Sequence, residues 1–157
     1  MSELTQLLIF RLEQQRCALP LTAVERVVRA VEVTPLPNAP AIVVGVIDVE
    51  GRVLPVLNIR RRFRLPEREI RPADQFLIAR TARRIVVLAV DEAQGVVEHP
   101  ATDVVESAQI VPGLEQLQGV AKLDDGLALI YDLDKFLSLD EARTLDAAMR
   151  QEVAHGA

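Results

Sequence analysis

A β-hairpin predicted over residues 45–59 constrains the fold of this chain more than any other stretch. Its two apolar arms, 45–49 and 53–59, flank Glu50-Gly51-Arg52, which forms the turn because glycine adopts positive φ without steric cost. The second arm is apolar at almost every position, which is typical of a strand buried on both faces. Pro55 cannot donate a ladder hydrogen bond, so we expect it at an edge, a bulge or a barrel corner. Such a hairpin needs partner strands.

The rest of the chain can supply those partners. Half of its residues are apolar, only 3% are aromatic and tryptophan is absent, so the core must be built from aliphatic side chains, many of them β-branched. Apolar runs bounded by turn residues predict further strands. These strands are expected over residues 6–13, 16–21, 75–81, 84–90, 95–100, 117–123 and 126–133.

Two capping-box patterns predict helix starts. Thr22-Ala23-Val24-Glu25 predicts a short helical turn that ends near Val28, and Ser138-Leu139-Asp140-Glu141 predicts a longer helix over 138–154. The second helix has an apolar stripe at helical spacing. Its members are Ala142, Leu145, Met149 and Val153.

Two polar stretches separate the predicted strands. Residues 64–74 contain Pro66 and Pro72 and are interpreted as a linker, whereas residues 102–116 are expected to be irregular. The basic run Arg60-Arg61-Arg62 lies beside the linker, where it forms either a solvated face or a contact with an acidic partner.

An internal repeat organises these elements. Residues 6–11 resemble residues 75–80, which lie 69 positions later (6 to 75), and the hairpin over 45–59 resembles residues 119–133, 74 positions later (45 to 119). We therefore predict a mainly β protein of two small lobes, 6–65 and 75–137, with the C-terminal helix packed on them. Five short strands per lobe that must hide their edges indicate a small, partly closed barrel in each.

Composition excludes several functions. The net charge of −5 gives no general electrostatic reason to bind nucleic acid or an anionic membrane. Cys17 is the only cysteine, so no intramolecular disulfide forms, and we interpret it as a small buried hydrophobe. The chain lacks an apolar run long enough to insert into a membrane and a signal-peptide pattern, so we expect a cytoplasmic protein.

No catalytic or metal site stands out in the sequence. His99 and His155 have no metal-ligand spacing to another ligand, and no glycine-rich phosphate loop or nucleophile elbow occurs. We therefore expect no cofactor, no metal and no enzymatic activity. A binding module is favoured, with an amphipathic helix lying in the cleft between the lobes. An enzyme in a β-barrel fold is the alternative from another class, and it would require a convergent polar cluster.

The segment from Gly45 to Arg60 resembles the signature of the CheW-like chemotaxis coupling proteins, Gly-x-x-Asn-x-Arg-Gly-x-x-x-Pro-x-x-Asp-Leu-Arg. The resemblance continues through the strand pairs, the second hairpin and the terminal helix. It implies two intertwined SH3-like barrels and a non-enzymatic adaptor that couples chemoreceptor tips to a histidine kinase of CheA type, whose regulatory domain shares the fold. It also implies structural roles for five motif residues. They are Gly51, Pro55, Asn58, Gly119 and Asp132.

Two departures from the signature carry charge. Asp48 stands at the position of the family's asparagine, and Glu50 stands at that of its arginine, which is tied to receptor coupling. Many members carry an acidic residue where this chain has Arg26, so the two signs are exchanged here. Our hypothesis is that Arg26 pairs with Glu50, with two unrelated surface charges as the alternative.

The resemblance also implies a receptor groove. Its floor would consist of Val24, Val27, Gly45 and Val96, with Arg26 and Glu50 at the rim. Because of the charge reversal, a CheW-like regulator of a different partner or kinase, in a motility or development pathway, is the second interpretation.

Overall fold

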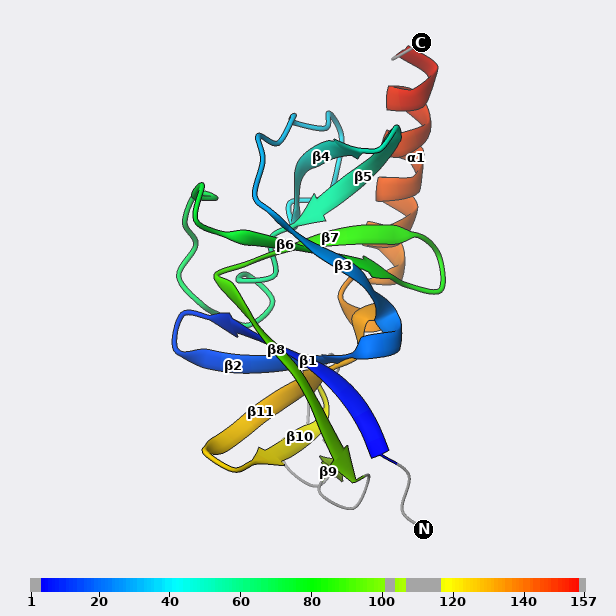
Figure 1. Cartoon of the computed structure of the whole chain (residues 1–157). Helices are drawn as coiled ribbons and strands as arrows, with labels where there is room; N and C mark the ends of the chain where they lie inside the picture. The colour runs from blue at the N-terminus through cyan, green and yellow to red at the C-terminus, as the bar shows by residue number, and fades with distance from the viewer. Residues whose placement is uncertain (1–3, 101–103, 107–116, 156–157) are drawn as a thin grey trace.

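Two β-sheets and one long helix form the described part of the chain, residues 4–100, 104–106 and 117–155 of a computed structural model (Figure 1). This architecture confirms the predicted mainly β fold class. The strands are β1 (Leu4–Leu12), β2 (Gln15–Pro20), β3 (Val24–Arg29), β4 (Val43–Val49), β5 (Arg52–Leu57), β6 (Gln75–Arg80), β7 (Ile85–Val90), β8 (Glu92–Pro100), β9 (Val104–Glu106), β10 (Leu117–Leu123) and β11 (Gly126–Tyr131). The helical elements are the 3₁₀ turns η1 (Leu21–Ala23) and η4 (Leu133–Lys135) and the helix α1 (Leu139–His155).

The order of strands shows how the two sheets use the chain. A five-stranded sheet, β3-β6-β7-β5-β4, is built from the continuous stretch between β3 and β7, and we call it the central sheet. The other sheet, β8-β1-β2-β11-β10-β9, combines both ends of the chain, and we call it the terminal sheet. The segments 6–65 and 75–137 therefore each contribute strands to both sheets. Figure 1 shows the sheets one above the other, with α1 beside the central sheet.

The internal repeat is visible in the pairing of the strands. The pair β1–β2 of the first half joins β11 of the second, and the pair β6–β7 of the second half joins β5 of the first. Positions related by the two sequence offsets occupy equivalent places in the ladders. The ladder pair Val28↔Phe76 corresponds in this way to Leu7↔Val97. Likewise, Val56↔Val87 corresponds to Ala18↔Ile130, and Gly45↔Val56 corresponds to Gly119↔Ile130. The two halves are thus duplicated and exchange strand pairs.

Three apolar clusters form the core, and two of them are copies of each other. The cluster of the terminal sheet contains Leu7, Ile9, Ala18, Ala121, Ala128 and Ile130. The same offsets convert these positions into members of the central-sheet cluster, which are Phe76, Ile78, Val87, Ile47, Leu54 and Val56. The largest cluster contains residues of both sheets together with Leu145, Ala148 and Met149 of α1. Its composition shows that the sheets and the helix share one continuous apolar interior.

The predicted helical turn near Val24 is wrong. Only Leu21–Ala23 form a 3₁₀ turn, and Val24–Arg29 continue as strand β3, which pairs with β6. A short helix is marginal without a tertiary face to hold it. β-branched Val24, Val27 and Val28 instead favour the strand conformation, in which they gain a ladder.

The second capping box is confirmed. The Glu141 amide donates to Ser138 Oγ at 3.1 Å, and the Ser138 amide donates to Glu141 Oε1 at 2.8 Å. The helix carries its buried side chains where the sequence places its apolar stripe, except that the side chain of Val153 lies outside the described residues. The expectation of irregular structure over 102–116 is wrong at Val104–Glu106, which form β9. The other positions of that stretch fall outside the described residues.

Candidate partner-binding surface

The tip of the β4–β5 hairpin is a two-residue turn. Glu50 and Gly51 both have positive φ, 53° and 83°, which is the geometry of tight hairpin turns that match the twist of their strands. Asp48 Oδ1 accepts the Gly51 amide at 2.8 Å and thereby fixes the turn. The turn projects the Glu50 side chain outward, and 71% of it is exposed.

Two ion pairs connect this tip to the start of β3. Arg26 Nη2 lies 3.1 Å from Glu50 Oε1, so the structure contains the pair hypothesised from the exchanged signs. Beside it, Arg52 forms a two-pronged contact with Glu25, at 3.2 and 3.1 Å. The hydrogen bond from Arg52 holds the pKa of the Glu25 carboxyl below its ordinary value. The surface therefore presents alternating charges, and the four side chains form a patch that we call the seam quartet.

The seam quartet lies where the central sheet closes on itself. β3 and β4 are the two edge strands of that sheet, and Thr34, in the segment that follows β3, forms an isolated bridge with Val46 of β4. The bridge has two hydrogen bonds, from the Thr34 amide at 2.9 Å and from the Val46 amide at 2.7 Å. A Cβ atom on Gly45 would lie 2.2 Å from the Thr34 carbonyl oxygen, which is far inside van der Waals contact. Gly45 is thus a glycine because the backbones approach closely at this seam.

The other residues of the expected groove lie on two different sheets. Val24 and Val27 are partly buried on β3 and pack against the largest apolar cluster. Val96 lies on β8 of the terminal sheet and is 49% exposed. The structure therefore brings Val24, Arg26, Val27, Gly45 and Glu50 to one sheet. A shared groove that includes Val96 stays a prediction.

Asn58 and Asp132 play the same structural part in the two halves. Asn58 Oδ1 accepts the Arg60 amide at 3.2 Å, and Asp132 Oδ1 accepts the Asp134 amide at 3.1 Å. Each side chain starts the turn that follows its hairpin, since short polar side chains readily bond to a nearby backbone amide. The signature has aspartate at the position of Asn58, and in this chain asparagine makes the same capping hydrogen bond there.

Pro55 and Gly119 sit at irregular points of the ladders. Pro55 pairs with Val46 on β4, and the parallel pairing of β5 with β7 begins only at the next residue, Val56. Proline, which has no amide hydrogen, is tolerated at this position because the edge of β5 that faces β7 is not paired at Pro55. Gly119 follows a register shift after Leu117, equivalent to the shift before Gly45.

A partly buried group of charges that the sequence did not suggest joins the two sheets. Asp91 stands between β7 and β8, where the chain leaves the central sheet, and its carboxylate contacts Arg60, Arg68 and Arg11. Arg60 also contacts Glu13, and Arg68 also contacts Asp74, at 2.7 Å. We call these six residues the Asp91 cluster. It holds three positive and three negative side chains, so its charges balance.

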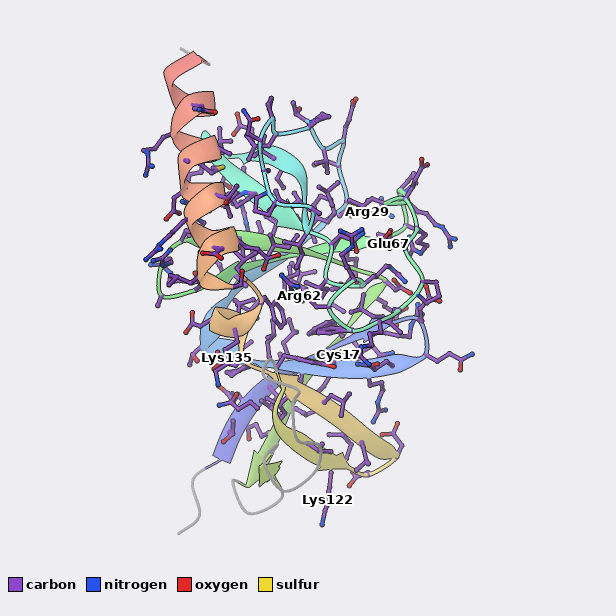
Figure 2. The ribbon with its side chains drawn as sticks, turned by 180° about the vertical axis from the view of Figure 1, so that it is seen from behind. Cys17, Arg29, Arg62, Glu67, Lys122 and Lys135 are labelled. Atoms are coloured by element: carbon purple, nitrogen blue, oxygen red, sulfur yellow. The ribbon has the colours of Figure 1, made fainter. Side chains whose placement is uncertain are left out.

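The basic run beside the linker is therefore not a solvated face. The Arg60 side chain is only 5% exposed, and its acidic partners belong to the same chain. Arg62 lies between the linker and the base of α1, where it donates to the Phe136 carbonyl and contacts Glu141 (Figure 2). Arg61 alone is largely exposed, beside Glu67. The position of Arg60, directly after the mostly apolar segment 53–59, was the signal that could have revealed its burial.

The linker is fixed by the same contacts. Leu65 packs against the largest apolar cluster and Ile70 against the cluster of the central sheet. Asp74 Oδ2 accepts the Arg71 amide at 2.8 Å, and Asp74 itself is buried. Residues 64–74 thus form a strap across the first half of the molecule instead of a free connection.

We expect acid to destabilise the protein through Asp74 and Glu141. Burial would raise the pKa of both carboxyls, but hydrogen bonds from Arg68 to Asp74, and from the Ser138 amide and Arg62 to Glu141, hold each pKa below its ordinary value. Such a group stabilises the fold above its unfolded pKa, about 4, and loses that contribution as the pH falls through the folded pKa. Urea unfolding between pH 7 and pH 3 should show a smaller decline for Asp74→Asn than for the wild type. Parallel curves would contradict this assignment.

Cys17 is buried on β2, in the middle of the molecule (Figure 2), as expected for a small apolar residue. Burial raises the pKa of its thiol to about 12, which keeps it protonated at neutral pH. Within the described ranges no group of three or more His, Cys, Asp and Glu side chains is placed to hold a metal ion. No helix among the described residues is long and apolar enough to cross a membrane.

Comparison with known proteins identifies relatives along most of the chain. The model of the CheW-like domain family matches residues 6–141. The chemotaxis protein CheW of Treponema pallidum (strain Nichols) is 26% identical over 146 residues, which cover 89% of this chain and 86% of that protein. CheW of Rhizobium meliloti (strain 1021) is 26% identical over 138 residues, covering 87% and 89%. Protein FrzA of Myxococcus xanthus is 32% identical over 95 residues, covering 60% and 59%.

A solved structure has the same fold. The crystal structure of the scaffolding protein TtCheW from Thermoanaerobacter tengcongensis matches with a TM-score of 0.80 at 22% identity, covering 90% of this chain and 96% of that one. The exchanged arrangement of two β-lobes is therefore shared by both molecules.

Proposed function

Because the chain belongs to the CheW-like domain family, we propose that it is a non-enzymatic adaptor that couples chemoreceptor tips to a histidine kinase of CheA type. The single observation that supports this role most is the position of the signature hairpin. Its strand β4 approaches the Thr34 backbone closely at Gly45, and the ion pairs of the seam quartet hold its tip against β3. We infer that an adaptor of this kind acts in the cytoplasm, recruited to membrane-associated receptor arrays, without inserting into the membrane.

A titration tests the proposal directly. The purified chain is expected to bind the regulatory domain of a CheA-type kinase and, separately, a helical hairpin that corresponds to a receptor tip. Adding both should give one complex of all three components. Failure to bind the kinase domain would contradict the adaptor role.

A second candidate function rests on Glu50. An acidic side chain now occupies the exposed tip where the family signature has arginine, and like charges on a partner would be repelled there. The chain would then regulate a different partner or kinase in a chemosensory-like pathway of motility or development. Binding of the kinase domain without binding of the receptor tip would favour this second function.

Exchange of the charges of Arg26 and Glu50 tests whether the pair is an energetic unit. We expect Arg26→Glu and Glu50→Arg each to weaken binding of the partner, and the double variant to recover part of the loss. The pair is 40% and 71% exposed, so its coupling energy should be about 0.5 kcal/mol, the range of exposed ion pairs. A double-mutant cycle on stability and on partner binding measures this coupling.

The neighbouring pair provides a matched control for that cycle. Glu25 and Arg52 form a two-pronged contact in the same patch, so a cycle of Glu25→Arg and Arg52→Glu should show coupling at least as large. If the Arg26 and Glu50 variants are strictly additive while the control pair couples, the two residues are unrelated surface charges.

A further inference from the structure

The two crossovers between the sheets occupy equivalent places in the duplicated fold. One crossover leads from β2 through η1 into β3, and the other leads from β7 through Asp91 into β8. The offset of 69 positions relates Thr22 of the first crossover to Asp91 of the second (22 to 91), and it relates β3 to residues 93–98 of β8. Both β3 and β8 are edge strands (Figure 1). The molecule therefore contains two copies of one segment, which can be compared directly.

The crossover at Asp91 is firmly anchored. Val90 is only 1% exposed and belongs to the largest apolar cluster, and the Asp91 carboxylate contacts the three arginines of the Asp91 cluster. Asp91 Oδ2 also accepts the backbone amide of Glu13 at 2.9 Å. Charge-assisted hydrogen bonds are strong where water has little access, so these donors fix the backbone on either side of the carboxylate. β8 thus begins from a fixed point.

The equivalent crossover at Thr22 has a weaker anchor. Leu21, which stands at the place of Val90, is only partly buried, and Thr22 is exposed. A hydroxyl replaces the carboxylate, so the ion pairs of Asp91 have no counterpart in this copy. The turn η1 contains no buried residue, and an open hollow of about 210 Å³ lies beside it. β3 thus begins from a point that is held only by partly buried side chains.

β3 itself adds little to this hold. None of its six residues is buried, and it pairs with β6 along one edge. The chain is fixed again beyond its end, because the Ala30 amide donates to the Asp74 carbonyl at 3.0 Å and Thr34 bridges to Val46. Before that point, the two ion pairs of the seam quartet tie β3 to the β4–β5 hairpin. Segments with few buried contacts open locally at a low cost in free energy.

We propose that residues 21–29 form a salt-sensitive flap, which opens locally while the equivalent residues 90–98 stay closed. The ion pairs of the seam quartet hold the flap shut. All four of their side chains are at least 37% exposed, so dissolved salt screens these pairs, whereas the Asp91 side chain is only 10% exposed and is screened much less. Salt therefore loosens one copy of the segment and leaves the other unchanged.

Opening of the flap separates the members of the seam quartet. Glu25 and Arg26 lie in the flap, whereas Glu50 and Arg52 lie on the hairpin. The alternating charge pattern exists only in the closed state, so any partner that recognises this pattern also closes the flap. The flap follows from the duplicated fold and its contacts alone, whichever partner the surface binds.

Native-state hydrogen exchange of the full chain, followed by NMR, tests the flap. Protection of the Val27 and Val28 amides is compared with that of their equivalents, Val96 and Val97, in about 20 mM and about 500 mM NaCl. We expect lower protection in the flap at both salt concentrations, with a further loss of about threefold at the higher one. The amides of Val96 and Val97 should not respond to salt.

Thr22→Asp should stabilise the closed flap. The new carboxylate takes the place of Asp91 and shares the hollow with Arg80, which is the equivalent of Arg11 (11 to 80). We expect the protection of the two flap amides to rise about threefold, and most of this gain to disappear in about 500 mM NaCl. Thr22→Asn introduces a side chain of the same shape without the charge, so this control should exchange like the wild type.

Glu50→Gln tests the ion pairs that hold the flap. Removal of this charge should lower the protection of the flap amides about twofold in about 20 mM NaCl and should reduce the response to salt. Glu67→Gln removes an exposed ion pair from the strap and should leave the flap unchanged. Equal protection of the two equivalent segments would overturn the proposal. So would a salt effect of equal size in both segments, or equal exchange of the Thr22→Asp and Thr22→Asn proteins.

Discussion

Arg60→Ala is expected to lower the free energy of unfolding by about 3 kcal/mol, because it takes a buried partner away from the nearly buried carboxylate of Asp91. The Arg60 side chain is 5% exposed and contacts both Asp91 and Glu13, at the point where the chain passes between the sheets. Arg68 and Arg11 remain beside Asp91 in the variant, so the loss should lie at the lower end of the range for a broken buried ion pair. Urea unfolding at pH 7 measures it.

Arg61→Ala is the matched control for this prediction. Arg61 is the next residue, has the same charge and contacts only the exposed Glu67, so its loss should change stability by no more than about 0.5 kcal/mol. Equal effects of the two substitutions would show that the Asp91 cluster does not stabilise the junction between the sheets.

Gly45→Ala should have an effect of similar size through a different cause. The new methyl group would lie 2.2 Å from the Thr34 carbonyl oxygen, and this atom belongs to a backbone that cannot move without breaking the bridge to Val46. Overpacking of this kind costs about 2–3 kcal/mol. We also expect faster hydrogen exchange at the Thr34 and Val46 amides, which form the two hydrogen bonds of the bridge.

Gly51→Ala distinguishes the destabilising effect of a steric clash, as at Gly45, from that of an unfavourable backbone conformation. No atom lies within 4 Å of a Cβ built on Gly51, but its φ of 83° is unfavourable for alanine. We expect a loss of about 1 kcal/mol, from strain at the turn, without faster exchange at Thr34. If Gly45→Ala behaves like Gly51→Ala in both measurements, the seam does not depend on the missing side chain.

Local patterns in the sequence predicted most of the strands and the duplication. Alternating or continuous apolar runs are preserved in the structure because each side chain of a strand has a fixed face, and the hairpin of residues 45–59 forms at its predicted turn. The capping box at Ser138 is equally local, since all of its hydrogen bonds lie within four residues. The exchanged signs of Arg26 and Glu50 led to a contact because the comparison with the family signature already implied their proximity.

The features that the sequence did not predict depend on distant partners. Thr22-Ala23-Val24-Glu25 has the residues of a helix start, and only the ladder with β6 explains why Val24 begins a strand. Asp91 is separated from Glu13 by 78 positions, so neither residue signals the other, and Arg68 looked like part of a flexible polar stretch. Pairing of strands across the halves is invisible to a search for repeats, which aligns equivalent strands and not neighbouring ones, and only the family resemblance implied it.

The way in which the terminal sheet gathers both ends of the chain sets an order for synthesis on the ribosome. The central sheet is continuous in sequence and can close as soon as β7 has emerged. The β1–β2 hairpin, although made first, obtains β8 next and β11 only after about thirty further residues, which take about 1.5–6 s at ordinary translation rates. During this interval Leu7, Ile9 and Ala18 lack their later partners Ala128 and Ile130. The nascent amino terminus is therefore the part of this protein that a chaperone would have to shield.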